Sequence, residues 1–149
     1  MTTRNIEQGF WRSENAPWIE LRTTLQSTQA YKLHQHAQLS IGAIVAGETV
    51  TFCDGRSYHL HPGDMVMIAP DVAHSCNPVS GTARSYHMLY IDKAWCLAQL
   101  GGQAGDALRC EHTLIRDPPL FAAYLRVIEL LHGNRTDLLQ GAVRDLLAV

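Results

Sequence analysis

Through Ile91, short runs of alternating apolar and polar residues are separated by turns rich in glycine and proline. Such alternation places every second side chain on the same face, and it is typical of half-buried strands. Asp54-Gly55, between two of these runs, is a strong hairpin signal. The pattern predicts strands at residues 18–24, 28–36, 38–46, 48–53, 57–61, 64–69, 74–77 and 84–91. Short strands joined by such turns indicate a sandwich or a small barrel.

After Ile91 the apolar residues recur with a helical period. Asp92 can cap a short helix that ends before Gly101-Gly102. Asp117 followed by a proline is typical of a helix start. Apolar stripes then predict an antiparallel pair of helices at residues 118–132 and 136–147.

These two helices offer more apolar positions than a contact with one barrel needs, and surplus apolar surface usually marks a partner site. We therefore expect a homodimer. The stripe of the last helix continues to the end of the sequence, which indicates a cut between domains or a helix that needs a partner. The predicted interface residues are Tyr124, Leu131, Leu139 and Leu146.

The chain has 149 residues, of which 46% are hydrophobic, and this suits one domain with its own core. We expect an N-terminal arm at residues 1–17, a β-barrel at residues 18–91 and a helical segment at residues 92–149. The net charge of −2 and the singly scattered arginines argue against a nucleic-acid surface. The sequence contains neither a signal-peptide core nor an apolar stretch of about 18 residues, so we expect a cytoplasmic protein without a membrane contact.

His34-Gln35-His36 is the first candidate for chemistry. On a strand, His34 and His36 share a face, and two converging imidazoles are a common beginning of a metal site. The alternative is a pair of hydrogen-bonded or solvated histidines, which are common elsewhere. His59 and His61 are interpreted as surface residues of the hairpin.

The order and spacing of several residues resemble the two motifs of the cupin barrel: His34-x-His36, Gly47, Pro62-Gly63-Asp64, Pro70 and His74. Residues 86–95 followed by a helical hairpin resemble the N-terminal effector-binding domain of AraC-type transcription regulators. The resemblance covers residues 18–147. It implies a mostly β protein with C-terminal helices, namely a cupin-type double-stranded β-barrel (jelly roll) followed by an antiparallel helical hairpin.

The resemblance also implies a function. The chain would sense a small-molecule effector and would contact DNA only through a C-terminal helix-turn-helix domain that nothing in this sequence matches. The alternative from another class is a small metal-dependent cupin enzyme, an oxygenase or isomerase with a three-histidine centre. Because acidic residues are almost absent from the predicted barrel strands, acid–base catalysis is the weaker hypothesis.

In the cupin arrangement, His34, His36 and His74 would form a three-nitrogen set for a divalent transition metal, with zinc or nickel as first choices. Ser40 stands where the cupin pattern usually has a glutamate, so the set lacks its usual carboxylate. Because His87 and Tyr90 lie on opposite faces of the last strand, at most one of them points inward. The candidate effector contacts are Ser40, Cys76, His87 and Tyr90.

Overall fold

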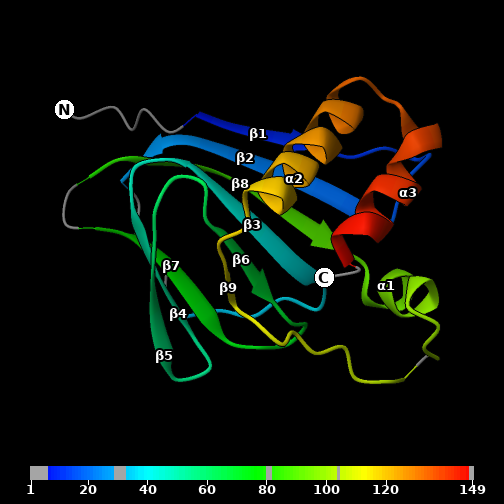
Figure 1. The fold of residues 1–149 in the computed structure, drawn as a ribbon, viewed down its shortest axis with the longest axis horizontal. Helices are drawn as coiled ribbons and strands as arrows, with labels where there is room; N and C mark the ends of the chain where they lie inside the picture. Colours follow the sequence, from blue (N-terminus) through cyan, green and yellow to red (C-terminus); the bar gives the residue numbers. More distant parts are fainter. Residues whose placement is uncertain (1–6, 29–32, 80–81, 104, 148–149) are drawn as a thin grey trace.

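The computed structural model describes residues 7–28, 33–79, 82–103 and 105–147, and it shows two antiparallel sheets with helices packed on one side (Figure 1). The larger sheet has the order β1 (Glu7–Trp11), β2 (Ile19–Ser27), β8 (Arg84–Ile91), β3 (Leu39–Ala46), β6 (Met65–Ile68) and β9 (Leu114–Ile115). The smaller sheet has the order β5 (Arg56–Leu60), β4 (Thr49–Cys53) and β7 (His74–Pro78).

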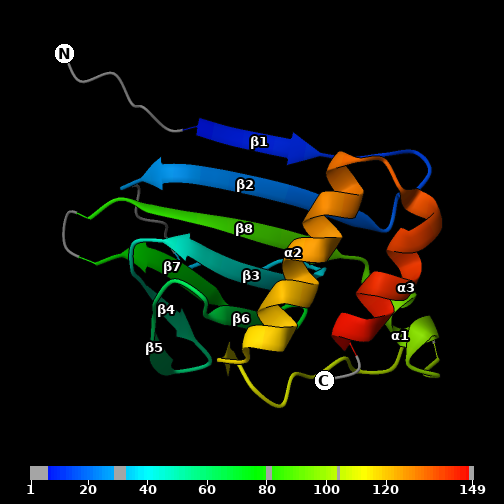
Figure 2. The same cartoon turned by 45° about the horizontal axis from the view of Figure 1, so that its top comes forward.

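Three helices lie on the face of the larger sheet that points away from the smaller one (Figure 2). They are α1 (Lys93–Gln99), α2 (Pro118–His132) and α3 (Thr136–Leu147). Asp92 and Asp117 cap α1 and α2 by accepting hydrogen bonds from backbone N–H groups in the first turn. The ranges of α2 and α3 are those that the sequence predicts. None of the described helices is both long enough and apolar enough to cross a membrane.

Strand alternation divides the apolar side chains between two cores. In β8, Leu89 and Ile91 pack toward the helices, whereas Tyr86 packs between the two sheets. Tyr124 of α2 is fully buried on the helix side, and its hydroxyl donates to the backbone oxygen of Ile41 over 2.7 Å. This hydrogen bond attaches α2 to the middle of the larger sheet.

Arg84 joins the two sheets at one end. Its side chain is buried, with 1% of the residue exposed. One nitrogen donates to the backbone oxygen of Ser27 in β2, and another donates to that of Cys76 in β7, each over 3.0 Å. Because a buried charge is costly unless its donors are satisfied, these two bonds hold β2 and β7 at a fixed separation.

The structure corrects three sequence-based expectations about strands. Residues 7–11, expected in an irregular arm, form the edge strand β1, and the two-residue strand β9 was not predicted. The strand predicted at residues 28–36 was wrong, because β2 ends at Ser27 and residues 33–38 pair only at His34, in an isolated bridge. Residues 29–32 of that prediction lie outside the described part of the chain.

The residues predicted for a dimer interface do not form a surface. At most 1% of each is exposed, because all four pack into the core between the helices and the larger sheet. The homodimer itself stays a prediction, and a second copy would have to bind through other side chains. The four buried residues are Tyr124, Leu131, Leu139 and Leu146.

A first prediction concerns Gly47, in the turn between β3 and β4. Its φ is +74°, and a Cβ there would lie 2.2 Å from the backbone oxygen of Ala83. Gly55 also has a positive φ, of +77°, but nothing lies within 4 Å of its hypothetical Cβ. We expect Gly55→Ala to cost about 1–2 kcal/mol through backbone strain alone, and Gly47→Ala to cost at least roughly 2 kcal/mol more. Urea denaturation would measure both, and equal losses would contradict the steric argument.

Candidate metal centre and ligand pocket

Two backbone hydrogen bonds bring the histidine segments together. The N–H of His34 donates to the oxygen of His74 over 2.9 Å, and the N–H of His74 donates to the oxygen of His34 over 2.7 Å. The N–H of Asp71 donates to the oxygen of His36 over 2.7 Å. The segment before β3 is thus fastened to the start of β7 and to the turn before it.

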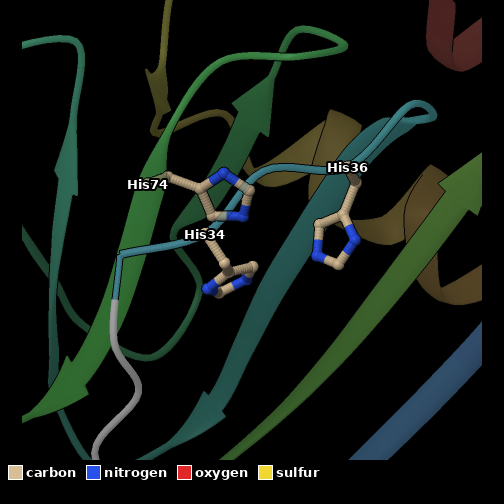
Figure 3. A group of neighbouring side chains, drawn as sticks. All are labelled: His34, His36 and His74. Atoms are coloured by element: carbon tan, nitrogen blue, oxygen red, sulfur yellow. The ribbon is translucent and has the colours of Figure 1, made fainter.

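The three imidazoles gather around one space (Figure 3). Each ring offers one nitrogen such that the three atoms lie within 4.8 Å of one another. The ring centroids are 4.5 Å apart for His34 and His74, 4.9 Å for His34 and His36, and 5.4 Å for His36 and His74. The structure therefore groups the three residues that the sequence proposed as metal ligands.

Burial and mutual repulsion keep two of these rings neutral. Burial lowers the pKa of His36 to about 4, with further lowering from the nearby positive charges of His34, His74 and Arg22. Burial also lowers the pKa of His74, against a hydrogen bond to Val72 that raises it. Neutral imidazole is the form that binds a metal, so the site is ready for one at neutral pH.

The hydrogen bonds of the histidine rings also leave ring nitrogens available as metal ligands. Nδ1 of His74 must be the protonated nitrogen, because it lies 2.9 Å from the carbonyl oxygen of Val72, which can only accept. Nε2 of His74 is then left with a lone pair. Nε2 of His36 is buried without a hydrogen-bond partner among the described residues. Buried polar atoms normally have partners, so this donor set fits a bound metal ion.

A cavity of about 210 Å³ opens beside the three rings. The cation of Arg22 lies over the ring of Tyr90, with 5.7 Å between its Cζ and the ring centroid. Neither aspartate nor glutamate is among the lining residues, so the pocket combines imidazole and tyrosine rings with the positive charge of Arg22. The lining consists of Arg22, His34, His36, His74, Cys76, Tyr86, Met88 and Tyr90.

A second cavity, of only about 10 Å³, lies farther between the sheets near Gly42. Cys76, Tyr86 and Met88 line both cavities. These three side chains therefore separate the histidine pocket from the small cavity.

The structure distributes the predicted effector contacts unevenly. Tyr90 and Cys76 line the histidine pocket. The thiol of Cys76 lies 3.3 Å from the Thr51 hydroxyl, and burial raises the pKa of this thiol, which favours the protonated form in the metal-free protein. Ser40 is buried outside the pocket lining, and its hydroxyl has no partner among the described residues.

His87 does not fit an effector-binding role in this pocket. It lies in β8 one residue from Met88 and so projects from the other face of the sheet. There its Nδ1 is 2.8 Å from the Thr23 hydroxyl. Burial lowers the pKa of His87, with a smaller lowering from His132 of α2.

Sequence reasoning missed Arg22, Tyr86 and Met88 as lining residues. Strand parity was the available signal, since Tyr86 and Met88 share the face of Tyr90 along β8. Arg22 is paired with Met88 in the register of β2 and β8. The pairing of strands distant in sequence could not be read from either strand alone.

The model of the AraC-like ligand binding domain matches residues 19–147. The chain belongs to this family. It is also 29% identical over 63 residues to the uncharacterised HTH-type transcriptional regulator YbfI of Bacillus subtilis, a match that spans 42% of this chain and 23% of that protein. This AraC-type chain is accordingly a ligand-binding domain that senses an effector.

Solved structures support the cupin-like fold. A cupin 2 conserved barrel domain protein of Salinispora arenicola aligns with a TM-score of 0.50 and 21% identity, over 62% of this chain and 80% of the other. A Ralstonia eutropha protein described as a candidate mannose-6-phosphate isomerase aligns with a TM-score of 0.52 and 14% identity, over 60% and 87%. The predicted jelly roll with C-terminal helices is thus confirmed, as two facing sheets rather than one closed barrel.

A second prediction follows from the pKa of His36. In metal-free protein, the unfolded chain takes up a proton at His36 as the pH falls below about 6.5, whereas the folded state stays neutral until about pH 4. The free energy of unfolding should therefore decrease with falling pH in this window, by at most about 1.4 kcal/mol per pH unit from this residue. His36→Gln should flatten that slope in denaturation curves recorded with a chelator. His112→Gln, at an exposed position, is the control, and equal slopes for all three proteins would contradict the assignment.

Proposed function

We propose that this domain binds a small carboxylate-bearing effector at a metal-loaded three-histidine centre. One observation carries the proposal: the pocket joins three clustered imidazoles to the cation of Arg22 and has no acidic residue in its lining. Such a lining favours an anionic ligand, because nothing in it repels negative charge and one fixed charge attracts it.

His34, His36 and His74 would hold the metal, with zinc or nickel as the best candidates for a set of three imidazoles. When bound, the ion would supply a Lewis-acidic centre with coordination positions left for water or an effector oxygen. The backbone bonds between His34 and His74, and the bond from His74 to Val72, keep the rings oriented for this role.

The remaining lining determines which effectors fit. Arg22 is placed to pair with a carboxylate, while Tyr86, Met88 and Tyr90 offer apolar surface to the rest of the molecule. A volume of about 210 Å³ lies below the roughly 300–1,000 Å³ of pockets for drug-sized ligands. We therefore infer a small effector, such as a short aliphatic acid or an acid with a single ring.

The relay to the helices would pass through the central strand β8. Its side chains at positions 86, 88 and 90 line the pocket, and Leu89 and Ile91 pack beneath the helices. A ligand that shifts β8 changes the surface on which α2 and α3 rest, and close-packed cores transmit such shifts. The Tyr124–Ile41 hydrogen bond makes α2 follow the larger sheet.

Sensing is favoured over catalysis for the same reason. A pocket without a carboxylate lacks the usual partner of histidine in acid–base chemistry. The family match to a ligand-binding domain and the similarity to an HTH-type regulator support a place in a cytoplasmic transcription regulator that contacts DNA through a separate domain. The net charge of −2 supports the view that this domain adds little DNA affinity of its own.

The proposed metal centre predicts how many metal ions each chain binds. Protein purified without a histidine tag should contain or take up a transition metal, and His36→Ala should lose one equivalent by elemental analysis. At about 100 times its dissociation constant, zinc bound at this centre should stabilise the wild type by about 2.7 kcal/mol. The exposed His112→Ala is the matched control and should behave as wild type. Unchanged metal content in His36→Ala would refute the metal centre.

The effector part predicts selectivity for charge. In thermal melts, small carboxylic acids should raise the melting temperature, while their primary amides, equal in size but neutral, should not. Saturating ligand should produce a rise of roughly 5–10 °C. Arg22→Gln should abolish most of this rise, and Arg56→Gln, at an exposed position outside the pocket, should preserve it. Equal stabilisation by the amides would contradict an anionic effector.

A further inference from the structure

We propose that Glu48, His59 and His61 form a second divalent metal site, on the outer face of the smaller sheet. Their ligand atoms lie within 4.8 Å of one another, and the set shares no residue with the three-histidine centre. Two imidazoles with one carboxylate suit zinc, nickel, cobalt or copper.

The register of β4 and β5 collects these residues. Val50 is paired with His59, and the buried Thr49 is paired with the buried Leu60. One step farther along the same antiparallel register, Glu48 stands opposite His61. Because side chains alternate between faces, His59 and His61 both point outward beside Glu48.

The side-chain nitrogens converge on one carboxylate oxygen. Oε1 of Glu48 lies 3.1 Å from Nε2 of His61 and 3.7 Å from Nε2 of His59. The two imidazole rings are stacked, with centroids 4.5 Å apart and an angle of 19° between their planes. Nearly parallel rings present both Nε2 atoms on the same side, and a small rotation of the half-exposed Glu48 would make room for an ion between them and the carboxylate.

The buried carboxylate of Asp64 and the exposed guanidinium of Arg116 brace this arrangement. The carboxylate of Asp64 is 8% exposed; its Oδ2 accepts from the backbone N–H of His61 over 2.8 Å, and its Oδ1 accepts from Nε of Arg116 over 3.1 Å. Another nitrogen of Arg116 donates to the backbone oxygen of His59 over 3.1 Å. The backbone of both histidines is therefore fixed, as a pre-organised site requires.

His61 lies between two carboxylates, and this favours a cation at the cluster. Its Nδ1 is 3.6 Å from Oδ2 of Asp64, while its Nε2 faces Glu48. A neutral imidazole can donate from only one nitrogen. A metal on Nε2 would be held by Glu48 and His61 together and would leave Nδ1–H on the side of Asp64, 3.6 Å from its Oδ2.

The site also borders the start of α2. Arg116, which braces both histidines, is followed directly by Asp117, whose carboxylate caps α2 by accepting from the N–H of Leu120 over 3.2 Å. An ion bound at Glu48, His59 and His61 would therefore stiffen the hairpin against the segment that leads into the helices.

Equilibrium dialysis against zinc at pH 7.5, with the tag-free chain, tests this site separately from the first. Three variants are compared with the wild type. The double variant carries His59→Ala and His61→Ala, and the second variant carries His36→Ala alone. The third, His112→Ala at an exposed histidine, is the control. The double variant should bind one equivalent of zinc less than the wild type. This loss is expected whether or not the His36→Ala variant also loses an equivalent of zinc. Glu48→Gln, which keeps the side-chain size, should weaken zinc binding at this site at least about tenfold, and Glu129→Gln should not.

Cobalt offers a second readout that does not depend on stability. Its visible absorption reports the ligand field, so the signal that persists in His36→Ala should disappear when His59 and His61 are also replaced. Equal zinc stoichiometry in wild type and the double variant, with an unchanged cobalt spectrum, would overturn the proposal. A loss of zinc confined to His36→Ala would overturn it as well.

Discussion

Hydrogen bonds flank the histidine pocket at both of its ends. At one end, Arg84 donates to backbone oxygens of both sheets from a buried position. At the other, paired backbone bonds join His34, in the segment before β3, to His74 at the start of β7. The segments around the pocket cannot move apart without breaking these hydrogen bonds. These bonds fix the spacing of the strands, and this spacing leaves room for the pocket.

The same geometry explains why the rings of His36 and His74 remain uncharged. Protonating His36 would place its charge about 5 Å from the rings of His34 and His74 and near Arg22, in a partly buried site. The pocket therefore differs from one that merely contains basic residues, because burial keeps two of its imidazole rings neutral beside the cation of Arg22.

The sequence predicted those features that depend on nearest neighbours. Alternation located β8, and Asp117 with Pro118 located the start of α2. It failed where distant strands decide the outcome. His34 is held by His74 rather than by a regular strand, and Glu48 meets His59 only through the register of β4 and β5. The apolar stripes of α2 and α3 were correctly located but wrongly assigned to a partner, because periodicity shows that a face is buried without showing what buries it.

The side chains that separate the histidine pocket from the small cavity influence which ligands this fold can come to bind. Met88, one of the three side chains that line both cavities, is unbranched, has several rotatable bonds and fills irregular space. A shorter residue at this position would join the histidine pocket to the space near Gly42. The hydrogen bonds of Arg84, and those between His34 and His74, would stay in place. The depth of the pocket, and with it the length of molecule accepted, could thus drift during evolution through one position, without altering the residues that recognise the charged end.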